Sequence, residues 1–336
     1  MMRRNCYYQG PVSPHFDGQR FFNPGQPSTD KRLADMLRWR WQSRGLPRWH
    51  HVPVTQAARV PGRSAALRVT AIGHASVLIQ LAGVNVLVDP VWSDRVGPFP
   101  FIGPRRWNRA GIALDQLPPI DLILITHNHY DHLDLPTLKT LSGGHSPVVL
   151  APLGNDVIIQ RAIPSLPVVS LDWWDRHIAP QGALTISLTP AYHWSARGLR
   201  DRRMALWGGF HLQTAASSLY IAGDTAFGDG EIFRQISARL GAPDLAILPI
   251  GAYAPRWFMQ SVHMNPEEAV HAMQLLGARR ALGIHWGTFR LTDEDAHAPV
   301  DALAKALADH ALSAQRFAAL HPGQSLEFSA AAGTAR

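Results

Sequence analysis

Four side chains that could bind metal ions occur within six residues, directly after a short apolar run. The run is Asp121–Thr126, and the side chains that follow it are His127, His129, Asp131 and His132. Zinc and similar divalent ions prefer imidazole and carboxylate ligands. His127 and His129 could hold one ion while Asp131 and His132 hold a second, and two ions roughly 3.5–4 Å apart can share an attacking hydroxide. The alternative is a polar loop that is rich in histidine by chance, and the density of the cluster argues against it.

The pattern His-x-His-x-Asp-His after a strand resembles the signature of the metallo-β-lactamase superfamily. The resemblance implies an α/β (α+β) fold, a four-layer αββα sandwich in which helices flank two mixed β-sheets. It places the metal site at one edge of the paired sheets. The family takes further ligands from later loops, and candidates follow three expected strands in the right order: His193, Asp224 and His285.

The resemblance divides these ligands between two ions. One ion would be held by His127, His129 and His193, and the other by Asp131, His132 and His285. Asp224 would bridge them, because a carboxylate has two oxygens whereas each imidazole nitrogen serves one ion. A lone histidine at a strand end is more often an ordinary hydrogen-bonded residue, and Gly-Asp is a common turn. Order and placement together favour the ligand interpretation.

Further motifs resemble one branch of the superfamily, the phospholipase D that hydrolyses N-acyl-phosphatidylethanolamine and its bacterial relatives. The similarity runs from about residue 20 to residue 295. The motifs that carry it are Gly73–Ile79, Asp89-Pro90, Gly103–Arg106, His193-Trp194, Leu206–Gly208, Pro249–Tyr253, Pro255–Met259, His263, Asn265–Ala269 and Ile284–Phe289.

The branch resemblance implies a phosphodiesterase that acts on N-acyl-phosphatidylethanolamine-like phospholipids with two zinc ions. Iron and manganese use similar ligands. The ions would lower the pKa of a shared water toward about 7. Asp131 would orient the hydroxide, and His263 would hydrogen-bond the phosphoryl oxygens or help the leaving group. Another ester hydrolase on the same metal centre, such as a lactonase resembling the ascorbate-6-phosphate lactonase, remains the alternative, and a nuclease ranks below it.

Five further residues are weaker candidates for supporting the ligands or lining the substrate pocket. His74 lies on an expected strand and is expected to be a hydrogen-bonded core or supporting histidine. Asp89 either accepts a hydrogen bond from a ligand histidine or forms an ordinary turn. Trp257 is a core residue or lines an acyl-chain groove. Tyr253 is taken as a pocket residue because it ends the motif Pro249–Tyr253, and Tyr192 because it directly precedes the ligand candidate His193.

The element pattern predicts an arm at residues 1–66, packed on a hydrolase domain at residues 67–336. Asp30 could cap a helix that runs to about Trp41. The β-branched runs Val69–Leu81 and Val84–Val88 are separated by Ala82-Gly83, which predicts a hairpin. Further strands are expected at Asp121–Thr126, Val148–Leu150, Val168–Leu171, Leu184–Leu188, Leu206–Leu212, Ser218–Ala222 and Leu245–Ile250. Helices are expected at Leu135–Leu141, Asp156–Ile163, Glu231–Leu240, Pro266–Leu276 and Val300–Leu312.

Composition limits the class of protein. The 336 residues are 46% hydrophobic and 17% charged, which permits a large core and argues against disorder. The single cysteine, Cys6, excludes an intrachain disulfide and a cysteine-rich zinc site. Because neither a targeting segment nor an 18-residue apolar run is visible, we expect a cytoplasmic protein. Contact with the inner face of the membrane stays open.

The positive charge is concentrated near the N-terminus. Residues 1–110 contain 16 Lys and Arg against 5 Asp and Glu, a net +11, whereas residues 111–336 contain 16 against 20, a net −4. This distribution suggests an anionic partner or a solvated arginine-rich surface. We expect a phospholipid or other phosphodiester substrate and no nucleic acid, and leave a homodimer open. The arm arginines Arg38, Arg40, Arg44 and Arg48 are expected to bind anionic lipid, unless they form a structural strap.

Overall fold

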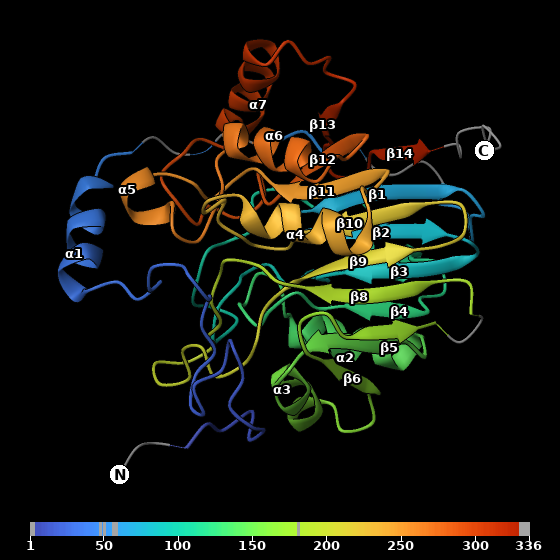
Figure 1. The fold of residues 1–336 in the computed structure, drawn as a ribbon, viewed down its shortest axis with the longest axis horizontal. Coiled ribbons are helices and arrows are strands. Elements are labelled where there is room, and N and C mark those ends of the chain that lie inside the picture. The colour runs from blue at the N-terminus through green and yellow to red at the C-terminus, as the bar shows by residue number, and fades with distance from the viewer. Residues whose placement is uncertain (1–3, 47–48, 50–51, 56–59, 180–181, 329–336) are drawn as a thin grey trace.

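Two seven-stranded sheets face each other, and helices cover both outer faces (Figure 1). The computed structural model describes residues 4–46, 49, 52–55, 60–179 and 182–328. The layers run helix, sheet, sheet, helix, which confirms the expected four-layer αββα sandwich.

Each sheet combines antiparallel and parallel pairs. The first sheet has the order β14-β1-β2-β3-β4-β5-β6, and the second has the order β13-β12-β11-β10-β9-β8-β7. The strands of the first sheet are β1 (Leu67–Gly73), β2 (Ser76–Leu81), β3 (Val84–Val88), β4 (Leu122–Leu124), β5 (Val148–Pro152), β6 (Val168–Leu171) and β14 (Ser325–Phe328). Those of the second are β7 (Arg176–Ile178), β8 (Thr185–Thr189), β9 (Gly209–Gln213), β10 (Ser218–Ile221), β11 (Leu245–Pro249), β12 (Arg280–Ile284) and β13 (Phe317–Ala319). Five central strands, β2, β3, β4, β10 and β11, are buried along their whole length because both of their faces are covered.

The helices pack on the outer faces through two apolar clusters. On the first sheet lie α2 (Leu135–Gly144) and α3 (Asn155–Ala162), and on the second lie α4 (Glu231–Leu240), α6 (Pro266–Leu275) and α7 (Ala298–Asp309). A short 3₁₀ turn covers Leu114–Gln116. The helices α1 (Leu33–Gln42) and α5 (Arg256–Met259) lie together at the edge of the sandwich (Figure 1). The described residues contain no helix with the length and apolar character that crossing a bilayer requires.

Local sequence signals explain several element ends. Ala82 and Gly83 both have positive φ, as a two-residue hairpin turn requires, and this turn joins β2 to β3 as predicted. Asn265 caps α6 by accepting a hydrogen bond from the Glu268 backbone, and the Glu268 side chain accepts in return from the Asn265 backbone. Pro266 occupies the first helical position, as expected.

Three expectations were wrong in detail. The run 69–81 is two antiparallel strands, because Gly73 and His74 adopt positive φ and reverse the chain. Asp30 does not cap α1, which begins after Arg32, and it pairs instead with the guanidinium groups of Arg202 and Arg203. Residues 206–208 lie outside β9. The short elements β7, β13, β14 and α5 were not predicted, because three or four residues carry too little periodicity to reveal them.

The N-terminal residues contribute directly to the main core. The rings of Phe16 and Phe21 are almost fully buried in the apolar cluster between the two sheets. Phe21 donates a backbone hydrogen bond to Arg203, and the Asn23 side chain donates to the backbone of His193. The division of the chain at residue 66 stays a prediction, and these contacts allow a test of the arm's role.

Replacing Phe21 by alanine should lower the free energy of unfolding by about 3–5 kcal/mol, because a fully buried ring would leave a cavity at the edge of the main core. The matched control is Val12→Ala, since Val12 is 70% exposed and should change stability by less than about 0.5 kcal/mol. Urea denaturation measures both. Equal stabilities for the two variants would show that the first residues are dispensable for folding.

Candidate metal centre

The expected ligands all follow strands that point to the same edge of the sandwich. In the first sheet, β1 and β3 are both antiparallel to β2, and β4 is parallel to β3, so these three strands share one direction. In the second sheet, β8, β10 and β12 likewise run in one direction. Their carboxyl ends lead to the side chains of the site: His74, Asp89, His127–His132, His193, Asp224 and His285.

One group of side chains that could hold an ion consists of His127, His129, His193 and Asp224, whose ligand atoms all lie within 4.8 Å of one another. His129 Nδ1 is 2.8 Å from His127 Nε2 and 3.3 Å from His193 Nε2. Nitrogens bound at roughly 2.0–2.1 Å to a tetrahedral zinc ion would be about 3.3 Å apart. The three imidazoles thus converge on a common point at about the spacing that one ion needs.

A second group surrounds the Asp131 carboxylate. Asp131 Oδ2 lies 2.9 Å from His74 Nε2, 3.5 Å from His132 Nε2 and 3.3 Å from His285 Nε2. The ligand atoms of these four residues also lie within 4.8 Å of one another. Asp131, His132 and His285 are the three residues that the sequence assigned to the second ion. His74 joins them by a hydrogen bond to Asp131, in the supporting position expected of it.

Asp224 lies between the two groups. Its Oδ2 is 3.7 Å from His193 Nε2 and 3.2 Å from His132 Nε2, whereas its Oδ1 is 3.2 Å from His285 Nε2. The single carboxylate therefore reaches histidines of both groups, which is the arrangement that a bridging ligand requires.

Several of these atoms are buried without a hydrogen-bond partner. Among the described residues, they include His132 Nε2, His285 Nε2 and Asp224 Oδ1, even though they lie close to one another. Buried polar atoms nearly always have a partner, and leaving one unpaired costs about 1–3 kcal/mol. Lone pairs that converge without hydrogen-bond geometry are what a divalent cation satisfies, so the residues fit metal ions.

Asp89 fixes the orientation of one ligand. Its Oδ2 accepts hydrogen bonds from His132 Nδ1, at 2.7 Å, and from the Thr126 hydroxyl, and its Oδ1 accepts one from the Thr126 backbone. A proton held on Nδ1 leaves the Nε2 lone pair of His132 directed at the cluster. His193 is oriented in the same way, because its Nδ1 lies 2.9 Å from the Val262 carbonyl oxygen.

Three residues of the site have a left-handed backbone, which is uncommon for residues other than glycine. The φ angles are +56° at His74, +39° at Asp89 and +66° at His285. Each such residue costs on the order of 1–3 kcal/mol and persists only where its surroundings impose it. Here the strained conformation turns each side chain sharply out of the end of its strand and into the cluster.

Burial and nearby charges shift the pKa values of the histidines in two directions. Burial lowers the pKa of His129 to about 4 and holds those of His127 and His193 well below the usual range, so these imidazoles are neutral, as ligands must be. Burial also opposes charge on His285, but Asp224 and Asp131 raise its pKa to about 9. A cation bound to His285 has to displace this proton, so metal affinity should weaken as the pH falls below about 9.

Aromatic side chains and His263 form the rest of the rim. The Trp194 ring lies 4.3 Å from that of His129 and carries the Arg202 guanidinium 3.5 Å above it. His263 Nδ1 is 3.9 Å from Asp224 Oδ2, so this predicted residue also lies at the cluster. His129, Asp131 and His263 are partly exposed while the remaining ligand candidates are buried, so the cluster is open to solvent on their side.

Three weaker candidates lie away from the ligand atoms. The Tyr192 side chain packs in the helix-side core, and its hydroxyl donates to Asp229. Tyr253 is half-buried, with its backbone bound to Glu294, and burial raises its pKa to about 12. The Trp257 ring carries the Arg38 guanidinium and faces the arm.

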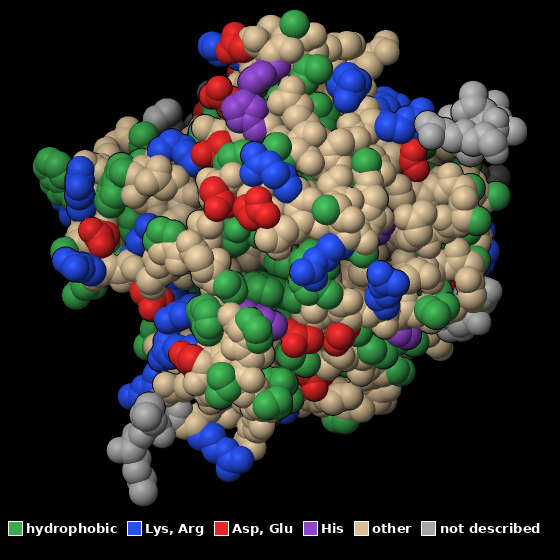
Figure 2. All heavy atoms as spheres, in the orientation of Figure 1, with side chains coloured by type: hydrophobic (Ala, Val, Ile, Leu, Met, Phe, Trp, Pro, Cys, Tyr) green, Lys and Arg blue, Asp and Glu red, His purple; other side chains and the backbone are tan. Residues whose placement is uncertain are grey.

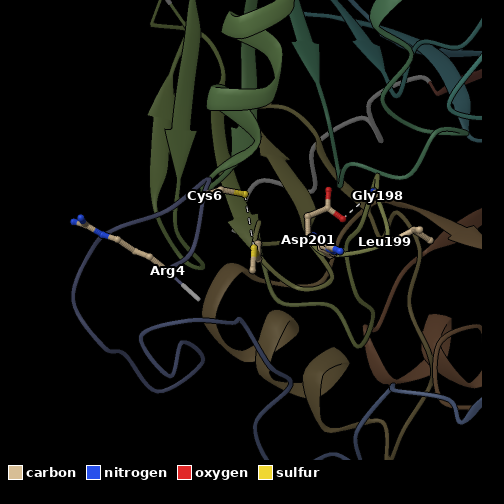
Figure 3. A pocket seen from close by; sticks show the side chains of 7 residues that line it. Arg4, Cys6, Gly198, Leu199 and Asp201 are labelled. Carbon is tan, nitrogen blue, oxygen red and sulfur yellow. Dashed lines mark hydrogen bonds between the residues drawn. The ribbon is translucent and has the colours of Figure 1, made fainter. Parts of the chain in front are cut away.

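A separate surface cavity of about 470 Å³ lies between the N-terminal residues and the loop after Trp194 (Figure 3). Asp201 is the acidic residue of its lining, and its carboxylate is already bound by backbone amides of Arg197 and Gly198 and by the Tyr7 hydroxyl. Cys6 Sγ lies 3.7 Å from Met204 Sδ. This cavity contains none of the clustered ligands, so the chemistry belongs at the sheet edge.

Known proteins share both the sequence pattern and the fold. The family model described as "Beta-lactamase superfamily domain" matches residues 84–286, which include all seven expected ligands. The chain is 40% identical over 227 residues to "N-acyl-phosphatidylethanolamine-hydrolyzing phospholipase D 1" of Caenorhabditis elegans, covering 66% of this chain and 64% of that protein. The chain thus spans less than two thirds of that relative's length.

Two more proteins extend the comparison. A "UPF0173 metal-dependent hydrolase" of Rubrobacter xylanophilus is 31% identical over 228 residues, which are 66% of this chain and 82% of that protein. The crystal structure of an isothiocyanate hydrolase from Delia radicum gut bacteria matches with a TM-score of 0.63 at 19% identity, covering 78% of this chain and 99% of that one. At that identity the structural match demonstrates a shared fold only.

Trp194 and Arg202 were not singled out as site residues by the sequence. Trp194 directly follows a ligand candidate within a quoted motif, so its position next to His193 was the available signal. Arg202 lies nine residues beyond His193 in an irregular loop, and no local pattern connects it to the cluster.

Asp89→Asn should weaken metal binding about 10–100-fold, because the carboxylate that holds His132 would be lost while the side chain keeps its shape and tolerates positive φ. Competition with a zinc indicator measures the affinity, and a thermal melt checks the fold. Asp115→Asn is the matched control, since Asp115 is exposed. An unchanged zinc affinity in a folded Asp89→Asn protein would disprove the orienting role.

Proposed function

Because the chain belongs to the metallo-β-lactamase superfamily and is a metal-dependent hydrolase of that fold, we propose that it is a phosphodiesterase of the phospholipase D type. Its substrates are N-acyl-phosphatidylethanolamine-like phospholipids. One observation carries the proposal: two groups of buried ligands share Asp224, an arrangement suited to a pair of ions that clamp a phosphoryl group. The 40% identity to a nematode enzyme named for this activity supports the substrate class.

We assign the ligands to two ions in the division that the sequence suggests. His127, His129 and His193 would hold one zinc ion, Asp131, His132 and His285 would hold the other, and Asp224 would join them. When bound, such ions lower the pKa of water and neutralise phosphoryl oxygens. Iron and manganese accept the same mixture of imidazole and carboxylate ligands.

The chain's own groups have separate tasks in this hydrolysis. Asp131 is ionised, since its pKa lies well below the usual range even though burial opposes the charge, and the nearby His132 stabilises it. It can therefore accept a hydrogen bond from the attacking water and orient it toward phosphorus. Burial lowers the pKa of His263 to about 4, so this imidazole is neutral and donates a hydrogen bond to a phosphoryl oxygen. The water oxygen forms a new bond to phosphorus as the P–O bond to the alcohol breaks, and the proton that the water gives up passes to the leaving oxygen, so phosphatidic acid and an N-acylethanolamine leave.

An apolar surface beside the site supports access from a lipid bilayer. On α1, Leu33, Leu37 and Trp41 are 72%, 60% and 68% exposed, and their spacing places them on one helix face. Arg40 and Arg44 are exposed on the same segment, and Figure 2 shows apolar and basic side chains together over α1. Such a helix favours an anionic membrane surface.

This helix is connected to the rim of the metal centre. The Trp39 ring stacks on Phe258 of α5 at 4.8 Å, and Arg38 covers Trp257. The loop after α5 leads to Val262 and His263, which contact the cluster. A bilayer that binds α1 would therefore lie close to the side on which His129, Asp131 and His263 are exposed.

Asp131→Asn should lower kcat/KM by at least about 100-fold with the fold intact, because the amide cannot accept hydrogen bonds as the carboxylate does. Turnover is measured across N-acyl-phosphatidylethanolamine, soluble phosphodiesters and lactones, with metal content determined in parallel. Asp309→Asn, at an exposed ion pair, should behave like the unaltered protein. If the unaltered protein hydrolyses lactones faster than phosphodiesters, it is the alternative ester hydrolase. If Asp131→Asn turns over substrate at a near-normal rate, Asp131 does not orient the attacking water.

Vesicles that contain anionic lipid should bind the protein, more weakly as salt is raised. Arg40→Gln with Arg44→Gln should weaken binding about 30-fold at low salt, since each arginine near the surface contributes about 1 kcal/mol. Leu37→Ser with Trp41→Ser should weaken it at both low and high salt, because apolar burial is not screened. Arg48 lies outside the described residues. Co-sedimentation with the vesicles measures these effects. If the unaltered protein does not bind vesicles at low salt, substrate does not reach the site from a membrane surface.

A further inference from the structure

A third group of potential ligands lies far along the chain from the loop that holds most of the catalytic cluster. Glu267 and His271 belong to α6, and His310 directly follows α7. Their ligand atoms lie within 4.8 Å of one another. We propose that these three residues form an additional site for zinc or a similar transition-metal ion, which links α6 to α7.

The sequence and the helix geometry bring the three side chains to one place. Glu267 and His271 are four residues apart, so they project from the same face of α6 on successive turns. The His310 ring meets the His271 ring edge to face, with ring centroids 4.7 Å apart. Figure 2 shows histidine side chains beside acidic ones on the surface over α6 and α7.

The scaffold that holds these ligands is rigid before any ion binds. Val270 and Met273 of α6 pack with Leu303 and Leu307 of α7 in the apolar cluster that covers the second sheet. The relative positions of the two helices are therefore fixed by buried contacts. Only side-chain rotations are needed to bring the three ligand atoms to the roughly 3.3 Å spacing of a tetrahedral site.

The charges around the cluster leave its carboxylate available. Lys305, the lysine of α7, forms its ion pair with Asp309 four residues later and interacts with Glu267 only through longer-range electrostatics. Within the described part of the chain, no hydrogen bond or ion pair engages the Glu267 side chain. The Phe227 ring lies beside the His271 ring, with ring centroids 6.1 Å apart. Because Phe227 is apolar, it does not hydrogen-bond the nitrogens of His271.

The donor set selects the class of ion. Two imidazoles and one carboxylate match the protein ligands of open zinc sites, in which water completes the coordination. Imidazole favours zinc, copper and nickel, whereas magnesium prefers oxygen ligands only. The ion held here would retain at least one water, and because none of its ligands belongs to the hydrolytic cluster it would link two helices and take no part in turnover.

The test is a titration of the zinc-loaded holoenzyme, after removal of excess metal, with Zn²⁺ in a calorimeter. The unaltered protein should bind one further equivalent, and His271→Ala with His310→Ala should bind none. Glu267→Gln should bind at least about tenfold more weakly, because it loses the charge and retains the shape. Mg²⁺ should produce no binding in any of these proteins.

The matched control is His177→Ala, which removes a partly exposed histidine of β7 and should keep the further equivalent. Thermal melts verify that all variants are folded, and their hydrolytic rates should equal that of the unaltered protein. The proposal is overturned if the unaltered holoenzyme takes up no further zinc, or if the double variant binds the same number of equivalents with the same affinity.

Discussion

Most of the site depends on the cost of burying charged and polar groups next to one another. Asp224 lies among histidines in the interior, and Asp131 lies among them at the partly exposed rim, where an unpaired charge would still be expensive to hold. Each carboxylate is therefore surrounded by imidazoles, and the nitrogens that lack partners converge on the same space. The proposed pair of cations would neutralise both carboxylates and give these lone pairs a partner. Burial opposes charge on all of these histidines, but the pKa values of His132 and His285 are raised because each lies within 3.5 Å of both Asp131 and Asp224. The pKa of His74, which contacts Asp131 alone, stays low.

The two-sheet sandwich brings the carboxylates and imidazoles of the site together. Strands that run in the same direction end at one edge in both sheets, so six loops present their side chains to a common volume. At three of these loops, His74, Asp89 and His285 adopt left-handed backbone angles that direct the side chains inward. The large core between the sheets, which also buries Phe16 and Phe21, stabilises the fold enough to retain such strain.

The N-terminal arm connects the core to the surface on which a lipid substrate would arrive. Phe21 is part of the main core, Asn23 bonds the backbone of His193, and α1 stacks on α5 beside the rim. Removing the arm would therefore disturb both stability and the approach to the metal centre. This coupling explains how a segment with too few apolar residues for a core of its own packs on the rest of the protein.

The sequence by itself determined the fold class, most strand positions and the seven ligand candidates, because their signals are local: apolar runs that end in histidine or aspartate, a capped helix start and a two-residue turn. Tertiary structure decided what depends on groups far apart in the chain. It placed His74 on Asp131 across 57 residues, turned Tyr192 away from the cluster, and brought Trp194 and Arg202 to the rim. It also placed His310 beside His271, which no spacing pattern indicates. Side-chain direction at a strand end is set by backbone angles and packing partners, and neither is written in the local sequence.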